Sequence, residues 1–159
     1  DMDALRLTSP AFEEGCPIPT RHTGFGEDVS PSLCLSGLCD EAVSMALVLD
    51  DLDVPLCRHY CHWLIWNLPP MAEIPEGIPH GPVVLSLGNA VQGMGYGTHR
   101  YRGPCPPPVV RNPHRYVFRA YILDCRLELS PASRRRTLMK AMSGHILQEA
   151  ALSGIFRRN

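Results

Sequence analysis

The stretch HWLIWNL, residues 62–68, decides the fold class of this 159-residue chain. Aromatic and β-branched side chains dominate it and two prolines follow, so it predicts a buried β-strand that ends before residue 69. A second stretch, RYVFRAYIL at residues 115–123, has alternating faces and predicts a long strand. Two such strands indicate a mainly β fold.

Shorter strands are predicted on both sides of these two. Apolar runs bounded by turn residues place them at residues 5–8, 33–35, 43–49, 83–85 and 149–156. Sixteen prolines, about twice the usual share of roughly 5%, break the chain between them. The connection over residues 88–113 is rich in glycine and proline, and a loop of that length inside a compact domain is usually functional or disordered.

One helix is predicted near the C-terminus. Ser130 and Pro131 are typical of a helix start, because the hydroxyl caps the first turn and proline fits the first helical position. Gly144 is suited to a C-terminal cap, so the helix is expected to end near Ser143. The arginines at 134–136 would lie in its first turns, the unfavourable end of the helix dipole, which indicates a solvated face.

Composition and charge limit the function. With 45% hydrophobic and 19% charged residues, the chain is expected to form one soluble domain over residues 1–159. Fifteen basic against sixteen acidic residues give a net charge of −1, which argues against nucleic-acid binding. No apolar run reaches the roughly 18 residues of a transmembrane helix, and the first residues do not resemble a signal peptide. We therefore expect no stable membrane insertion and a cytoplasmic protein, or a periplasmic one if a signal peptide was removed.

The cysteines and histidines do not form a recognisable metal or catalytic motif. Seven cysteines are an odd number and too few for a disulfide scaffold, so free thiols are expected. Cys57 and Cys61 are spaced CxxxC, which matches neither a redox motif nor a zinc site. His145 beside Gly144 is expected at a helix end, and the glycines around Tyr96 predict a turn. The known nucleophile, zinc and phosphate-loop motifs are absent, so we expect no metal, no cofactor and no enzymatic activity.

Polar side chains gather where predicted strands begin or end. Asp50, Asp51 and Asp53 follow one strand, His62 begins a second and His114 begins a third. If these strands are neighbours in one sheet, two imidazoles and a carboxylate meet at one rim. A carboxylate that accepts from one ring nitrogen leaves the other nitrogen to donate to a phosphate or carboxylate. The alternative is that the aspartates only cap turns, and that the histidines are an edge residue and an exposed one.

Three boxes of sequence occur in order along the chain. DLDVP at residues 51–55 resembles a DPDAP box, and the HW at residues 62–63 resembles the start of an HW strand. GPCPP at residues 103–107, followed by HRY at residues 114–116, resembles a GPCPP…HRY box. These boxes are the signatures of the phosphatidylethanolamine-binding protein family, in its shorter bacterial branch of Raf-kinase-inhibitor-like proteins. The resemblance extends over nearly the whole chain.

This resemblance implies an antiparallel β-sandwich with one or two short helices near the C-terminus and a small anion pocket at its rim. By position in the boxes, the pocket residues are Asp51, His62, Pro106, Pro107, His114 and Tyr116. Leu52 and Val54 replace the proline and alanine of the DPDAP box, and Leu52 leaves φ less fixed than proline would. The same box suggests a cis bond between Val54 and Pro55.

The leading hypothesis is a non-enzymatic protein that binds a phosphate-like or phospholipid head-group-like anion. The alternative is a protein-interaction module that inhibits a kinase or protease, with residues 88–113 as its contact surface. A hydrolase is the third hypothesis, although the sequence offers no activated nucleophile. The expected partners are a small anionic or phosphorylated ligand and, under the alternative, a protein; the sequence also allows a homodimer.

The leading hypothesis predicts that His62 and His114 approach one another in the fold although they are far apart in sequence. It also predicts that anion binding weakens as the pH rises through the histidine range. A protonated imidazole donates two hydrogen bonds and carries a positive charge that offsets Asp51.

Overall fold

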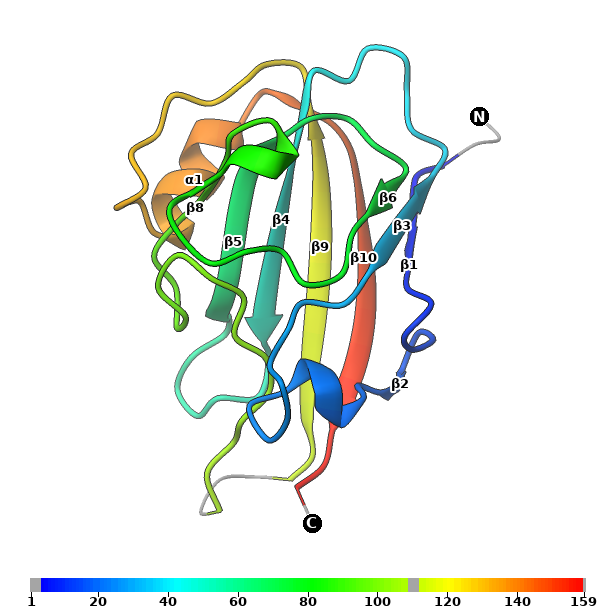
Figure 1. Ribbon diagram of the computed structural model, residues 1–159, viewed down its shortest axis with the longest axis vertical. Coiled ribbons are helices and arrows are strands. Elements are labelled where there is room, and N and C mark those ends of the chain that lie inside the picture. The colour runs from blue at the N-terminus through cyan, green and yellow to red at the C-terminus, as the bar shows by residue number, and fades with distance from the viewer. Residues whose placement is uncertain (1–3, 109–111, 159) are drawn as a thin grey trace.

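The computed structural model describes residues 4–108 and 112–158, and a seven-stranded sheet is its main element (Figure 1). The strands of this sheet lie in the order β2 (Cys16–Pro17), β10 (Ile146–Phe156), β9 (His114–Leu123), β4 (Ser44–Asp51), β5 (Tyr60–Leu68), β8 (Ala90–Gln92) and β7 (Val83–Val84). A smaller sheet contains β1 (Arg6–Thr8), β3 (Leu33–Ser36) and β6 (Glu73–Ile74). The helices of the described part are α1 (Arg135–Met142) and two short 3₁₀ helices, Thr20–His22 and Leu85–Leu87.

β4 is buried along its whole length because both faces of the large sheet are covered. Leu47 and Leu49 belong to the core that the large sheet shares with the small one. Ala46 and Val48 pack on the other side, in a core that includes Leu138 of α1. Alternate side chains of a strand point to opposite faces, so one uninterrupted apolar run serves two cores. The mainly β fold predicted from the sequence is confirmed.

The strands predicted from the sequence are all present, and their ends differ from the prediction by at most three residues. The patterns did not reveal β2, β6 and β8, because strands of two or three residues are too short to show a period. These strands depend on pairing with distant segments. β2, for example, runs parallel to the end of β10.

The helix begins later than its sequence predicts. Ser130 and Ser133 instead form a turn, in which the N–H of Ser133 donates to the carbonyl of Ser130 over 2.9 Å. α1 starts at Arg135 and ends at Met142. Gly144 follows with a φ of 85°, so the helix ends where the sequence predicts.

Arg134 and Arg136 are exposed as the sequence predicts, whereas Arg135 is partly buried and forms an ion pair with a buried carboxylate. Its guanidinium donates to both carboxylate oxygens of Asp50, with N–O distances from 2.9 to 3.2 Å. Asp50 is fully buried. Because Asp50 lies in β4 and Arg135 in α1, the ion pair links the helix to the large sheet.

Within the described residues, no helix combines the length and the apolar character needed to cross a membrane. The seven cysteines all fall in this part of the chain, and each is a free thiol.

Candidate functional site

The polar residues that the sequence singles out meet at one end of the large sheet. Asp51 ends β4, His62 lies near the start of β5, and His114 begins β9. β4 runs antiparallel to both neighbours, so Asp51 lies opposite Tyr60 of β5 and Tyr116 of β9. The end of one strand and the beginnings of two others therefore form a common rim.

A cavity of about 210 Å³ lies at this rim. Its lining contains the six residues assigned by resemblance, Asp51, His62, Pro106, Pro107, His114 and Tyr116. Val54, Pro55, Tyr60, Tyr96 and Cys105 complete the lining. The rings of His62 and His114 lie 5.4 and 6.2 Å from the ring of Tyr116, measured between centroids. Both histidines therefore reach the same pocket.

Asp51 and His114 form a buried pair in the pocket. Oδ2 of Asp51 lies 2.7 Å from Nδ1 of His114, and the two side chains are 4% and 3% exposed. An ionised carboxylate can only accept, so Nδ1 carries the hydrogen and donates it. Nε2 of His114 has no hydrogen-bond partner among the described residues. The carboxylate thus fixes the ring and leaves its second nitrogen for a ligand.

The three aspartates near the end of β4 form different hydrogen bonds and ion pairs. Oδ1 of Asp51 accepts the backbone N–H of Asp53 over 2.8 Å, so Asp51 both caps its turn and orients His114. Asp53 accepts the backbone N–H of Arg115 over 2.7 Å and its guanidinium over 3.1 Å. Burial would raise the pKa of Asp53, but the hydrogen bonds and charge of Arg115 outweigh it and lower the pKa. Asp50 lies in the ion pair with α1 and is not part of the pocket.

His62 and Tyr116 complete the polar part of the pocket. Nδ1 of His62 donates to the carbonyl of Arg102 over 2.8 Å, and burial lowers the pKa of the ring, so His62 is neutral near pH 7. The hydroxyl of Tyr116 is buried without a hydrogen-bond partner among the described residues. Burial and the charge of Asp51 raise the pKa of Tyr116 well above its usual range. This hydroxyl therefore stays protonated and can donate a hydrogen bond.

The turn after β4 does not contain the cis bond suggested by the DPDAP resemblance. Val54–Pro55 is trans, and the cis X–Pro bond of the described residues is Asn112–Pro113. The N–H of Cys57 donates to the carbonyl of Val54 over 3.2 Å, and Leu56 between them has a φ of 62°. Proline at the first central position and a positive φ at the second are features of a type II turn, which a trans proline satisfies.

Gly103 positions the wall formed by residues 105–107. Its N–H donates to Oδ1 of Asp28 over 2.8 Å. A Cβ at this position would lie 2.0 Å from the carbonyl oxygen of His22 and 2.7 Å from the hydroxyl of Tyr101. No side chain fits at that distance, so this part of the GPCPP box needs glycine for its close approach to the backbone.

We expect Gly103→Ala to lower the free energy of unfolding by about 1–3 kcal/mol, because the backbone around His22 must move. Gly95→Ala is the control, since its Cβ would lie 3.2 Å from its nearest neighbour and needs a smaller adjustment. Urea unfolding of both variants measures the difference. If both variants lose the same free energy of unfolding, the close contact between Gly103 and the backbone of His22 is not what makes glycine necessary there.

Tyr96 is a pocket residue that the sequence did not reveal. Its ring lies 4.9 Å from that of His62 and 5.6 Å from that of Tyr60, between centroids. The guanidinium carbon of Arg102 lies 4.3 Å from the centroid of the Tyr96 ring. The flanking glycines correctly indicate a turn, but a turn has no periodicity that shows which way its side chain points. A protein-contact role for residues 88–113 stays a prediction.

Comparisons with known proteins agree with this architecture. The family model described as phosphatidylethanolamine-binding protein matches residues 8–157. A UPF0098 protein of Methanothermobacter thermautotrophicus is 42% identical over 156 residues, which cover 97% of this chain and 99% of that protein. A UPF0098 protein of Pyrococcus abyssi is 42% identical over 142 residues, which cover 89% of this chain and 79% of that protein.

Solved structures show the same architecture. The crystal structure of a phosphatidylethanolamine-binding protein homolog from Chlamydia trachomatis has a TM-score of 0.86 at 36% identity, with 99% of each chain covered. E. coli YbcL, at 24% identity and a TM-score of 0.85, shares the fold over 98% of this chain and 99% of its own. The family match spans almost all of this chain, and close relatives are covered over most of their length. The chain belongs to the phosphatidylethanolamine-binding protein family.

Proposed function

We propose that the pocket binds a small oxyanion, such as inorganic phosphate or the phosphate of a lipid head group. Two unpartnered buried atoms carry this proposal, Nε2 of His114 and the hydroxyl oxygen of Tyr116. Both residues line the same cavity. A buried polar atom without a partner costs about 1–3 kcal/mol, and an anion that reaches both atoms would remove that cost.

Once His114 is protonated, the Asp51–His114 pair no longer repels an anion from the cavity. The Asp51–His114 pair then has no net charge, and the ring donates through Nε2. Both oxygens of Asp51 already accept hydrogen bonds, from His114 and from the backbone of Asp53. Asp51 therefore orients the histidine and caps its own turn, and the protonated ring balances its charge.

The absence of a nucleophile at His114 supports binding over nucleophilic catalysis. Asp51 and His114 resemble the acid and base of a catalytic triad. However, no hydroxyl or thiol of the described residues forms a hydrogen bond with Nε2 of His114. Because no nucleophilic side chain is bonded to it, Nε2 of His114 is left to meet a ligand directly.

The size of the cavity limits the ligand. Its volume of about 210 Å³ is below the roughly 300–1,000 Å³ of sites for drug-sized molecules. The family takes its name from phosphatidylethanolamine, whose head group carries a phosphate. A phosphate or a head group fits such a volume, whereas complete acyl chains would remain outside.

Sulfate should bind more tightly at about pH 5.5 than at about pH 8, because binding through Nε2 requires a protonated ring. Sulfate remains dianionic throughout this range, so the ligand does not contribute to the change. Calorimetry at the two pH values measures the effect.

Equal sulfate affinity at both pH values would mean that no histidine supplies the charge, and the proposal would fail. Phosphoethanolamine, titrated in parallel, distinguishes the two sources of phosphate. If it binds more tightly than inorganic phosphate, the pocket recognises a head group; if it binds more weakly, the free anion is the better ligand.

A further inference from the structure

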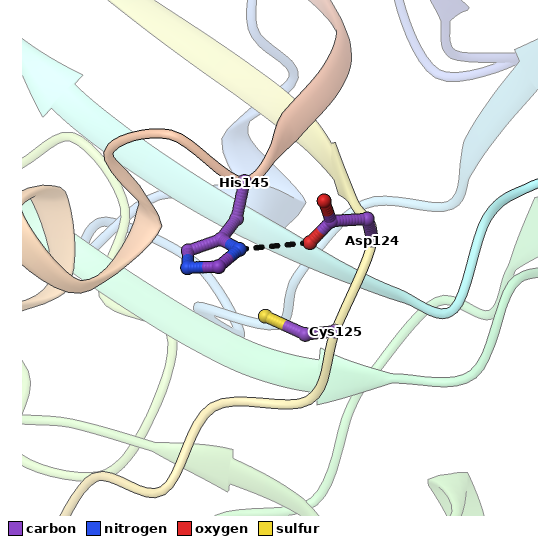
Figure 2. Close-up of side chains that lie close together, drawn as sticks. All are labelled: Asp124, Cys125 and His145. Atoms are coloured by element: carbon purple, nitrogen blue, oxygen red, sulfur yellow. Dashed lines mark hydrogen bonds and ion pairs between the residues drawn. The ribbon is translucent and has the colours of Figure 1, made fainter.

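A second cluster of titratable side chains lies at the other end of β9 from the pocket. Asp124 and Cys125 follow the last residue of β9, and His145 directly precedes β10 (Figure 2). β9 has ten residues, so at about 3.3 Å per residue the cluster is roughly 30 Å from His114. The cluster is therefore separate from the anion pocket.

The three side chains are close enough to share one ion. One donor atom from each of them lies within 4.8 Å of the other two. Nδ1 of His145 is 2.9 Å from Oδ1 of Asp124, and these side chains are 47% and 45% exposed. Figure 2 shows the imidazole and the carboxylate facing each other with the sulfur of Cys125 beside them. An ion could enter from solvent without a change of fold.

The backbone around the cluster is fixed by the sheet. The N–H of Asp124 donates to the carbonyl of His145 over 3.0 Å, which joins the end of β9 to the beginning of β10. The hydroxyl of Ser44 in β4 donates to the carbonyl of Cys125 over 2.6 Å. Gly144, with a φ of 85°, turns the chain from α1 into His145. A backbone fixed in this way does not have to be ordered when an ion binds, which lowers the entropy cost of binding.

We propose that Asp124, Cys125 and His145 bind one Zn²⁺-like divalent cation, with a water molecule at the fourth position. Thiolate, imidazole and carboxylate are the side-chain ligands of Zn²⁺, and a thiolate disfavours Mg²⁺ and Ca²⁺. The sequence alone gave no sign of this site, because its ligands come from two segments with no motif spacing.

Binding rearranges two hydrogens. The ion replaces the hydrogen between Nδ1 of His145 and Oδ1 of Asp124, and that hydrogen moves to Nε2, which points away from the cluster in Figure 2. The thiol of Cys125 releases its proton to solvent as it becomes a ligand. Two anionic ligands and one neutral ligand then balance the charge of a divalent cation.

Co²⁺ is the probe for this site, because thiolate ligation gives it a charge-transfer band in the near ultraviolet. The full chain, kept reduced, should develop this band with a single equivalent of Co²⁺, and Zn²⁺ should displace it. Cys125→Ser should abolish the band and weaken Zn²⁺ binding at least about tenfold in competition with a chromophoric chelator. His145→Gln, which can still donate to Asp124, should weaken Zn²⁺ binding to a similar degree.

Cys57→Ser is the matched control, since Cys57 is also a partly buried free thiol but lies in the turn after β4. This variant should keep both the band and the Zn²⁺ affinity. Thermal melts in the absence of metal check that each variant is folded. The proposal is overturned if the native chain shows no band, if Cys125→Ser retains it, or if Cys57→Ser loses it.

Discussion

The Arg135→Met substitution should lower the free energy of unfolding by about 3 kcal/mol at neutral pH. Asp50 is fully buried, and Arg135 binds both of its carboxylate oxygens. After the substitution the nearest guanidinium is that of Arg119, 3.7 Å from Oδ2. Breaking a buried pair costs about 3–5 kcal/mol, and we expect the lower end because Arg135 is itself partly exposed and Arg119 remains. Urea unfolding measures the loss.

Arg136→Met is the matched control for this experiment. Arg136 is the next residue of the same helix and is exposed, so its replacement should change stability by less than about 0.5 kcal/mol. Equal effects of the two substitutions would show that the Asp50 pair does not hold α1 to the sheet.

The Tyr116→Phe variant should lose about tenfold or more in sulfate affinity while the free protein becomes no less stable. The hydroxyl of Tyr116 is buried and unpartnered, so its removal takes away an unsatisfied group and is neutral or stabilising. In the complex the same hydroxyl donates to an anion, and a hydrogen bond to a charged group contributes about 1.5–3 kcal/mol. Calorimetry with sulfate and urea unfolding without it measure the two effects.

Tyr101→Phe provides the opposite case. Tyr101 is equally buried, but its hydroxyl donates to the carbonyl of His22 over 2.6 Å, and the residue does not line the cavity. This variant should lose about 1–3 kcal/mol of stability because the carbonyl is left unpaired, and should keep its sulfate affinity. If Tyr116→Phe instead destabilises the protein and leaves sulfate binding unchanged, the hydroxyl has a structural role and does not bind the anion.

The end of β4 shows how much of the candidate site can be predicted from the sequence. The apolar run before Asp50 correctly predicts a buried strand, and of the aspartates that follow it Asp51 lines the cavity. Asp50 and Asp51 are adjacent in β4 and so point to opposite faces of the sheet, but the local sequence does not show which face carries the pocket. Pairing with β9 separates their roles, because it places Asp51 beside His114, 63 residues further along the chain.

The start of the helix could not be predicted for a similar reason. Ser130 and Pro131 have the local chemistry of a helix start, but distant contacts determine what the segment does. The N–H of Met94 donates to the carbonyl of Ser133 over 2.9 Å, and this holds the residues before α1 against the loop after β8. Arg135, the first residue of the helix, meets Asp50 only because β4 lies beneath it.

Nitrogen NMR of the labelled imidazole rings, recorded with and without saturating sulfate at mildly acidic pH, tests the central claim most directly. Our account predicts that both His114 nitrogens lie at imidazolium positions in the complex and that sulfate shifts Nε2 more than Nδ1. His145 is the internal reference, because its Nδ1 lies 2.9 Å from an Asp124 oxygen much as that of His114 lies 2.7 Å from Asp51. His145 should not respond. Unchanged His114 resonances, or equal shifts at both rings, would contradict anion binding in this pocket.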